Sequence, residues 1–129
     1  MEPEASIKRY ISSALSFLPL SVEHASWRDE VLELAGNQWS LAATCAWRVT
    51  ASGRLLYGWE SIDAEMRVSE LIGCEIVAIS SQSEAMPSDP RFTFSSGLHL
   101  ELFSGQHLEP WISSLPDSVT YVASPGEVQ

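Results

Sequence analysis

Positive charges are scarce in this sequence. Of its 129 residues, 7 are lysine or arginine and 17 are aspartate or glutamate, which gives a formal net charge of −10. Lys8 is the only lysine, and no lysine or arginine follows Arg91. Nucleic-acid binding needs clustered cations, and anionic membranes attract basic segments, so we expect neither partner. A partner selected by charge would be a basic protein, although acidity also serves solubility alone.

Cysteines and long apolar runs are also scarce. The two cysteines, Cys45 and Cys74, form no CxxC pattern and lie in apolar surroundings. No apolar run approaches the roughly 18–20 residues that a membrane helix needs. The first residues, Met-Glu-Pro-Glu, lack the basic-then-apolar layout of a signal peptide. We therefore expect a cytoplasmic protein with two reduced, buried thiols.

Catalytic and metal-binding motifs are missing as well. The sequence has no glycine-rich phosphate loop and no G-x-S-x-G elbow. His99-x-Glu101 matches the first part of the zinc-deaminase motif, but no cysteine follows Cys74 to supply the second part. Structural zinc sites pair ligands a few residues apart, and no such pair occurs among His24, His99, His107, Cys45 and Cys74. We expect no cofactor, no metal and no enzymatic activity; a zinc site built from distant residues is the less favoured alternative.

The length fits a single domain over residues 1–129. Residues 4–18 predict an amphipathic helix that ends at Pro19 and buries its apolar stripe against a sheet. The stripe consists of Ile7, Tyr10, Ile11, Ala14, Leu15 and Leu18. Residues 20–30 fit no single element, and residues 31–34 fit a strand.

Strict alternation of apolar residues follows over residues 39–50. Every odd position is apolar: Trp39, Leu41, Ala43, Cys45, Trp47 and Val49. This pattern predicts one strand with one buried face. Gly53 can take a left-handed turn position, and residues 54–60 resume the alternation with Leu55, Tyr57 and Trp59. The two runs predict a β-hairpin.

The second half predicts one more helix and more strands. Ser61 or Asp63 would cap a short helix over residues 61–71, with Ile62, Met66 and Leu71 facing inward and Gly73 ending it. Strands are expected at 74–79 and 119–122, and a second hairpin at 91–103 turns at Ser96-Gly97. Residues 104–118 are expected to be turns. The fold class is α+β, a mostly antiparallel β-sheet of about six strands with the N-terminal amphipathic helix packed on it and one short helix after the first hairpin.

One stretch carries a resemblance. It is Asp89-Pro90-Arg91-Phe92-Thr93-Phe94-Ser95-Ser96-Gly97-Leu98-His99-Leu100-Glu101-Leu102-Phe103, preceded by Leu71-Ile72-Gly73-Cys74-Glu75-Ile76. It resembles small acidic bacterial proteins of unknown function, among them immunity proteins of polymorphic and contact-dependent toxin systems. The resemblance covers about the last half of the chain and implies an inhibitor that binds a cognate toxin. It assigns no functional residue, because immunity families share a role and not a motif.

The sequence therefore favours a non-enzymatic protein-binding module, an immunity-type inhibitor that neutralises a basic bacterial toxin. The alternatives are a small enzyme or ligand-binding domain with a dispersed site, or a subunit of a larger assembly. We expect His99 and Glu101 on a solvated strand face, opposite the leucines that flank them. Trp111, in a segment without strand pattern, is either a plug over the sheet edge, which we favour, or an interface anchor. The candidate partner-binding residues are Trp59, Glu60, His99, Glu101, Glu109, Trp111 and Asp117.

Overall fold

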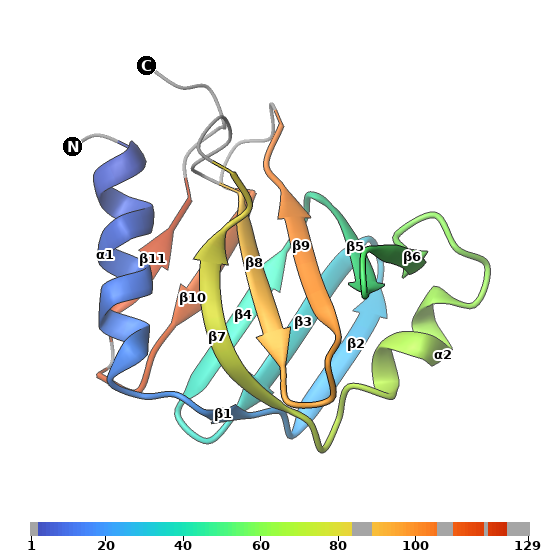
Figure 1. Cartoon of the computed structure of the whole chain (residues 1–129), viewed down its shortest axis with the longest axis horizontal. Helices are drawn as coiled ribbons and strands as arrows, with labels where there is room; N and C mark the ends of the chain where they lie inside the picture. The colour runs from blue at the N-terminus through green and yellow to red at the C-terminus, as the bar shows by residue number, and fades with distance from the viewer. Residues whose placement is uncertain (1–2, 84–88, 106–109, 118, 124–129) are drawn as a thin grey trace.

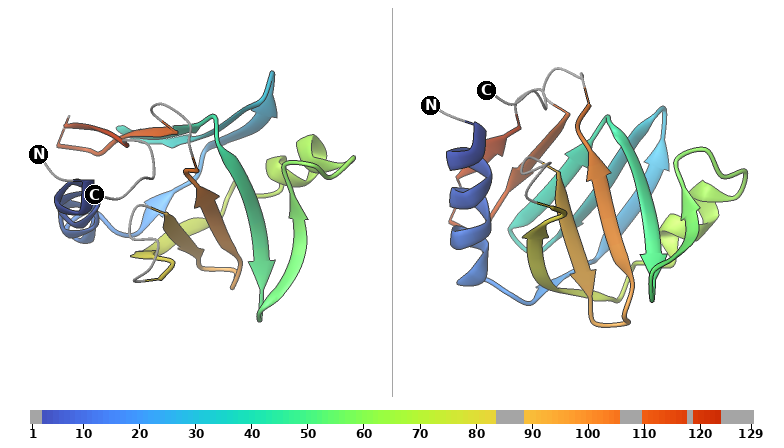
Figure 2. Two further views of the ribbon diagram at one scale, coloured as in Figure 1. Left: turned by 90° about the horizontal axis from the view of Figure 1, so that it is seen from above. Right: turned by 45° about the horizontal axis from the view of Figure 1, so that its top comes forward.

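Two antiparallel sheets form the core of the protein, as a computed structural model of residues 3–83, 89–105, 110–117 and 119–123 shows (Figure 1). The six-stranded sheet has the order β1-β7-β8-β9-β5-β6, and the five-stranded sheet has the order β11-β10-β4-β3-β2. In chain order, the helices and strands of the described residues are α1 (Pro3–Leu15), β1 (Leu20–Ser21), β2 (His24–Arg28), β3 (Val31–Gly36), β4 (Trp39–Ala43), β5 (Ala46–Ala51), β6 (Arg54–Gly58), α2 (Ala64–Ser69), β7 (Glu75–Ser81), β8 (Pro90–Phe94), β9 (His99–Phe103), β10 (Trp111–Ser114) and β11 (Thr120–Val122). The α+β class and the antiparallel pairing are confirmed. The prediction of one sheet with about six strands is wrong, because the described residues form two sheets (Figure 2).

The run predicted as one strand over residues 39–50 is two strands in different sheets. β4 belongs to the five-stranded sheet and β5 to the six-stranded one, and the chain crosses between them at Thr44 and Cys45. The predicted burial is confirmed for Trp39, Leu41, Ala43, Cys45, Trp47 and Val49. Alternation persists through the crossing because both strands turn the same side toward the core between the sheets. Periodicity thus reports the buried face but not which sheet a strand joins.

Both predicted hairpins are present. Ser52 and Gly53, with φ of 52° and 76°, connect β5 to β6, and Gly97, with φ of 95°, lies between β8 and β9. The alternation predicted for β6 is only partly right. A bulge shifts the register, since Val49 pairs with Tyr57 whereas Thr50 pairs with Leu55. As a result Tyr57 is buried while Leu55 is exposed, and Trp59, which follows the last residue of β6, is exposed as well.

The N-terminal helix closes one open side between the sheets (Figures 1 and 2). It packs against β7, and the Tyr10 ring lies 5.1 Å from the ring of Trp111 and 5.2 Å from that of Tyr121. The Tyr10 hydroxyl is also hydrogen-bonded to Ser113 Oγ at 2.9 Å. The helix ends at Leu15, before the predicted end at Pro19, and Leu15 is exposed.

The short helix α2 turns a different face inward from the one predicted. It packs against β2 and β6 through Ala64 and Val68, and Leu71 is buried beyond its end. The inward orientation predicted for Ile62 and Met66 is wrong, because both are exposed. Ala64 and Val68 are four residues apart and therefore share one helix face, which lies against the strands although its side chains are the smaller ones.

Two segments without a predicted strand also form strands, and the strand expected at residues 31–34 is present as part of β3. Residues 20–30 contain β1 and β2, and residues 31–36 form β3. Residues 111–114, predicted as turns, form β10, in which Trp111 is buried and pairs with Ala43 of β4. Four residues between Pro110 and Pro116 are too few to display a periodicity, so no local pattern indicated this strand.

Trp47 should be a major source of stability. Its side chain is fully buried, and its ring meets those of Trp27 and Tyr57 edge-on at 5.3 Å and 6.0 Å. We expect Trp47→Ala to lower the free energy of unfolding by about 3–5 kcal/mol, measured by urea denaturation. Trp59→Ala is the control: because Trp59 is 46% exposed, its loss should cost less than about 1 kcal/mol. Equal losses of stability in the two variants would contradict the assignment of Trp47 as a major core residue.

Candidate functional site

A groove lies where the chain crosses between the sheets. It encloses about 510 Å³ and is lined by Trp27, Glu30, Thr44, Cys45, Ala46, Trp59 and Glu60. Trp27 and Glu30 come from β2 and its turn, and Trp59 and Glu60 directly follow β6. The crossing residues 44–46 contribute the small side chains between these two walls. We call this the acidic–aromatic groove, after Trp27, Glu30, Trp59 and Glu60.

The two tryptophans of the groove are fixed by the backbone and by the core. The Trp59 N–H donates to the Trp47 carbonyl at 3.2 Å, and the Gly58 N–H donates to Ser61 Oγ at 2.9 Å. A Cβ on Gly58 would lie 3.0 Å from the Trp47 oxygen, so a larger residue would require the backbone to shift by a few tenths of an ångström. Trp27 is half-buried against the Trp47 ring. The Trp27 indole and the Trp59 backbone are thus held in place before any ligand arrives.

The Glu30 carboxylate is presented by an unusual turn. Asp29 and Glu30 connect β2 to β3 with φ of 55° and 62°, and both residues are exposed. Hairpin turns with two positive φ values favour asparagine and glycine, and a left-handed glutamate costs about 1–2 kcal/mol. Glu60 is exposed on the opposite side of the groove. Two carboxylates beside two indoles form a site for a cation, which both ion pairing and cation–π attraction would stabilise.

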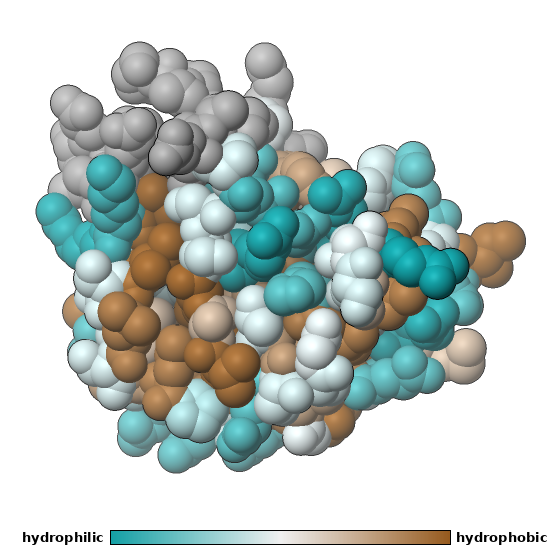
Figure 3. Space-filling model, in the orientation of Figure 1, coloured by the Kyte–Doolittle hydropathy of each residue, from teal (hydrophilic) through white to brown (hydrophobic). Residues whose placement is uncertain are grey.

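A second cluster lies on the outer face of the six-stranded sheet, where hydrophilic residues gather over β8, β9 and β5 (Figure 3). Glu101 of β9 pairs in register with Arg48 of β5 and Arg91 of β8. Its Oε1 accepts from Arg48 Nε at 2.6 Å, and its Oε2 accepts from Arg91 Nε at 2.8 Å and lies 2.7 Å from an Arg91 Nη. Arg48 also stacks over the Phe103 ring at 5.0 Å. We call these three residues the arginine–glutamate triad.

The triad corrects the expectation for Glu101. The residue does point away from the leucines beside it, but its side chain is only 3% exposed because the two arginines cover it. Burial by itself would raise the Glu101 pKa; the hydrogen bonds and charges of Arg48 and Arg91 outweigh this effect and hold the pKa below its usual value. Glu101 is therefore neutralised within the chain and is not available as a contact for a basic partner. His99 is half-buried, with Nδ1 hydrogen-bonded to Thr93 Oγ1 at 3.0 Å.

The remaining candidates are dispersed. Trp111 is buried in β10, between β11 and β4 of the five-stranded sheet, so it is a core residue of a strand and not a loop plug over the sheet edge or an exposed anchor. Asp117 is exposed in the segment between β10 and β11, which lie at the opposite end of the five-stranded sheet from β2. Its Oδ1 accepts from the Val119 N–H at 3.0 Å. Glu109 lies outside the described residues. The structure thus brings Trp59 and Glu60 together and separates them from the other candidates.

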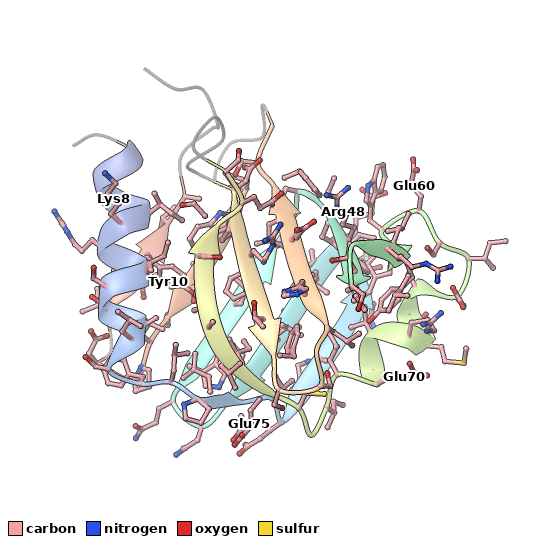
Figure 4. All side chains as sticks on the ribbon, viewed as in Figure 1. Lys8, Tyr10, Arg48, Glu60, Glu70 and Glu75 are labelled. Atoms are coloured by element: carbon pink, nitrogen blue, oxygen red, sulfur yellow. The ribbon has the colours of Figure 1, made fainter. Side chains whose placement is uncertain are left out.

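Four residues of the two sites were missed in the sequence. Trp27 and Glu30 lie in the segment that fitted no single element, and only the packing of the two sheets brings them to the groove that Trp59 also lines. Arg48 occupies an even, outward position of the alternating run, and this position was the available signal. Arg91 likewise occupies an outward position, next to the apolar Phe92. What the sequence could not supply was the register that brings both arginines to Glu101 (Figure 4 labels Arg48).

Two structural findings bear on other kinds of site. Among the residues that the structure describes, no group of three or more His, Cys, Asp or Glu side chains is arranged to hold a metal ion. Within the same ranges, no helix is long and apolar enough to cross a membrane. Both cysteines are free thiols, Cys45 buried and Cys74 half-buried.

The Cys45 thiol should resist modification in the folded protein. Burial raises its pKa to about 11, and the thiolate is the reactive form. In Cys74→Ser, which retains only Cys45, we expect labelling by Ellman's reagent at pH 8 to require denaturant. Cys45→Ser, which retains the half-buried Cys74, is the matched variant and should label faster. Rapid labelling of native Cys74→Ser would show that Cys45 is accessible from the groove.

Glu101 should stabilise the fold in a pH-dependent way. Its pKa is lowered from the ordinary 4.5, so its contribution is full above that pH and disappears as the pH falls through the folded-state pKa. We expect Glu101→Gln to lower the free energy of unfolding at neutral pH by about 1.5–3 kcal/mol, with the difference shrinking in acid. Urea denaturation across this pH range measures it. Glu33→Gln, at an exposed site 3.6 Å from His24, is the control and should change stability by less than about 0.5 kcal/mol. A loss in Glu101→Gln that equals the loss in this control, or that does not depend on pH, would contradict the prediction.

Comparison with known proteins leaves the groove to be interpreted from its own residues. No protein-family model, no curated protein and no solved structure matches the chain.

Proposed function

We propose that the protein is a non-enzymatic binding module whose partner is a basic protein, and that the acidic–aromatic groove receives a lysine or arginine side chain of that partner. The observation that carries the proposal is the placement of Trp27 and Trp59 beside Glu30 and Glu60 around a groove of about 510 Å³. A guanidinium or ammonium group could stack on an indole face there while a carboxylate accepts its hydrogen bonds.

The charge around the groove favours the same partner. Glu60 leads into α2, where Asp63, Glu65 and Glu70 are also exposed (Figure 4 labels Glu60 and Glu70). Arg67 lies near two of these carboxylates, 3.7 Å from Asp63 and 3.4 Å from Glu70. With a net charge of −10, the chain would attract a basic surface over a distance and raise the association rate.

The specific form of this proposal is an immunity-type inhibitor that neutralises a cognate bacterial toxin. The resemblance of residues 71–76 and 89–103 to immunity proteins motivates it. An acidic inhibitor can block a basic nuclease by occupying the surface that its substrate needs. Aromatic residues dominate binding energy at such interfaces, while peripheral charges mainly set the association rate. Trp59 would be the anchor, and Glu30 and Glu60 would orient the bound cation.

The test begins with the partner captured from the native host and continues with binding kinetics for two groove variants. We expect Trp59→Ala to weaken binding by about 2 kcal/mol, or roughly thirtyfold, mainly through faster dissociation. Glu60→Gln should slow association at low salt. Association of the wild type should also slow as salt rises, because charges more than about 10 Å apart are screened at 0.1 M. Ile62→Ala and Glu33→Gln, at exposed positions that do not line the groove, are the matched controls.

Three outcomes would decide against parts of the proposal. An acidic partner, or association that is indifferent to salt, would contradict the electrostatic argument. Equal effects of groove and control variants would place the interface elsewhere. A basic partner whose activity the protein does not inhibit would support binding but overturn the immunity role, and a toxin gene beside this gene would support that role.

A further inference from the structure

The outer face of the six-stranded sheet carries two rows of polar side chains across three neighbouring strands. Arg48, Glu101 and Arg91 form one row, and Thr50, His99 and Thr93 form the next. Each row takes one residue from β5, one from β9 and one from β8. Since alternate residues of a strand share a face, both rows face outward. They border a shallow hollow of about 360 Å³, which Leu55 and Gly53 close on the hairpin side.

The donors in this hollow exceed the acceptors. Each guanidinium has five N–H donors, whereas a carboxylate offers about four acceptor positions. Glu101 therefore cannot satisfy about ten donors of Arg48 and Arg91, and beyond its three contacts with them no hydrogen bond joins these arginines' side chains to the described residues. The two side chains are 48% and 39% exposed, so their remaining N–H groups are accessible from solvent.

The triad also has an unusual charge for this protein. Two guanidinium groups against one carboxylate leave one net positive charge, in a chain whose total is −10. Buried ion pairs are a weak source of stability, since apolar residues of the same volume often stabilise a fold equally well. Glu101 instead fixes the position of two planar forks, each suited to bind a carboxylate or phosphate group through two parallel hydrogen bonds.

We propose that Arg48 and Arg91, positioned by Glu101 and bordered by His99, form a binding site for an oxyanion, either a carboxylate or a phosphate group. The two guanidiniums donate to the anion from the floor of the hollow. Thr50 and His99 lie at its margin and complete a polar surface. The site is separate from the proposed role of the acidic–aromatic groove, because it requires neither tryptophan of the groove and takes a ligand of the opposite charge.

The experiment is an NMR titration of the full chain with sodium phosphate and, separately, with sodium acetate, both at constant ionic strength set with sodium chloride. We expect saturable shifts in the amides of residues 48–50, 91–93 and 99–101. Tighter binding of phosphate would indicate a phosphorylated ligand, and tighter binding of acetate would indicate an acidic side chain or a chain terminus. If neither anion shifts these amides more than chloride does, the proposal is overturned.

Two kinds of variant assign the binding to the arginines. Arg91→Lys keeps the charge beside Glu101 but removes the planar fork, and should weaken binding at least about fivefold. Leu55→Glu places a negative charge at the rim of the hollow, at a position that is 66% exposed, and should abolish binding without affecting the fold. Arg28→Lys in the other sheet and Ile62→Glu at an exposed position are the controls and should bind as the wild type does. Unchanged affinity in Arg91→Lys and Leu55→Glu would overturn the proposal, whatever the groove variants show with a basic partner.

Discussion

The passage of the chain from β4 to β5 is the constraint on which the rest of the structure depends. It places Trp39, Leu41 and Ala43 in one sheet and Trp47 and Val49 in the other, with all five side chains in the shared core. The Thr44 N–H donates to the Pro110 carbonyl at 3.0 Å, which ties the crossing to the segment before β10. Because the sheets are joined here by only two residues, the edges of β2 and β6 are held close enough for one groove to form between them.

The same crossing explains why the groove is lined as it is. Large side chains at residues 44–46 would fill it, but Thr44, Cys45 and Ala46 are small and leave about 510 Å³ open. The Trp47 ring lies directly behind, in contact with Trp27, and its backbone oxygen holds the Trp59 amide. A core residue thereby contacts the Trp27 indole through its ring and holds the Trp59 backbone through its carbonyl. Loss of Trp47 would consequently affect the binding surface as well as the free energy of unfolding.

Charge is arranged more unevenly than the composition suggests. Asp89 and Glu101 are buried, so neither contributes to the acidic surface. Exposed carboxylates gather around the groove and α2, whereas Arg48 and Arg91 lie together on the outer face of the six-stranded sheet. A hollow of about 320 Å³, lined by Arg48, Leu55, Trp59 and Glu60 among others, lies between the two sites. The β5–β6 hairpin thus carries regions of opposite charge on its two sides, which would restrict the orientation of any partner that contacts both.

The sequence by itself determined the buried faces, the two hairpins and the antiparallel α+β class, because side-chain alternation and glycine turns are local properties of the chain. It placed Trp59 and Glu60 at the end of the strand predicted over residues 54–60, whereas both residues follow β6 and are exposed. Tertiary structure decided that the alternating run divides between two sheets, that α2 turns Ala64 and Val68 inward, and that Trp111 is core. It likewise decided the burial of Glu101. The outward orientation of this residue was predictable, but its burial depends on Arg48 and Arg91 from two other strands. Pairing register and sheet membership arise from contacts between residues far apart in sequence, and a local pattern carries no information about which distant residue will lie opposite.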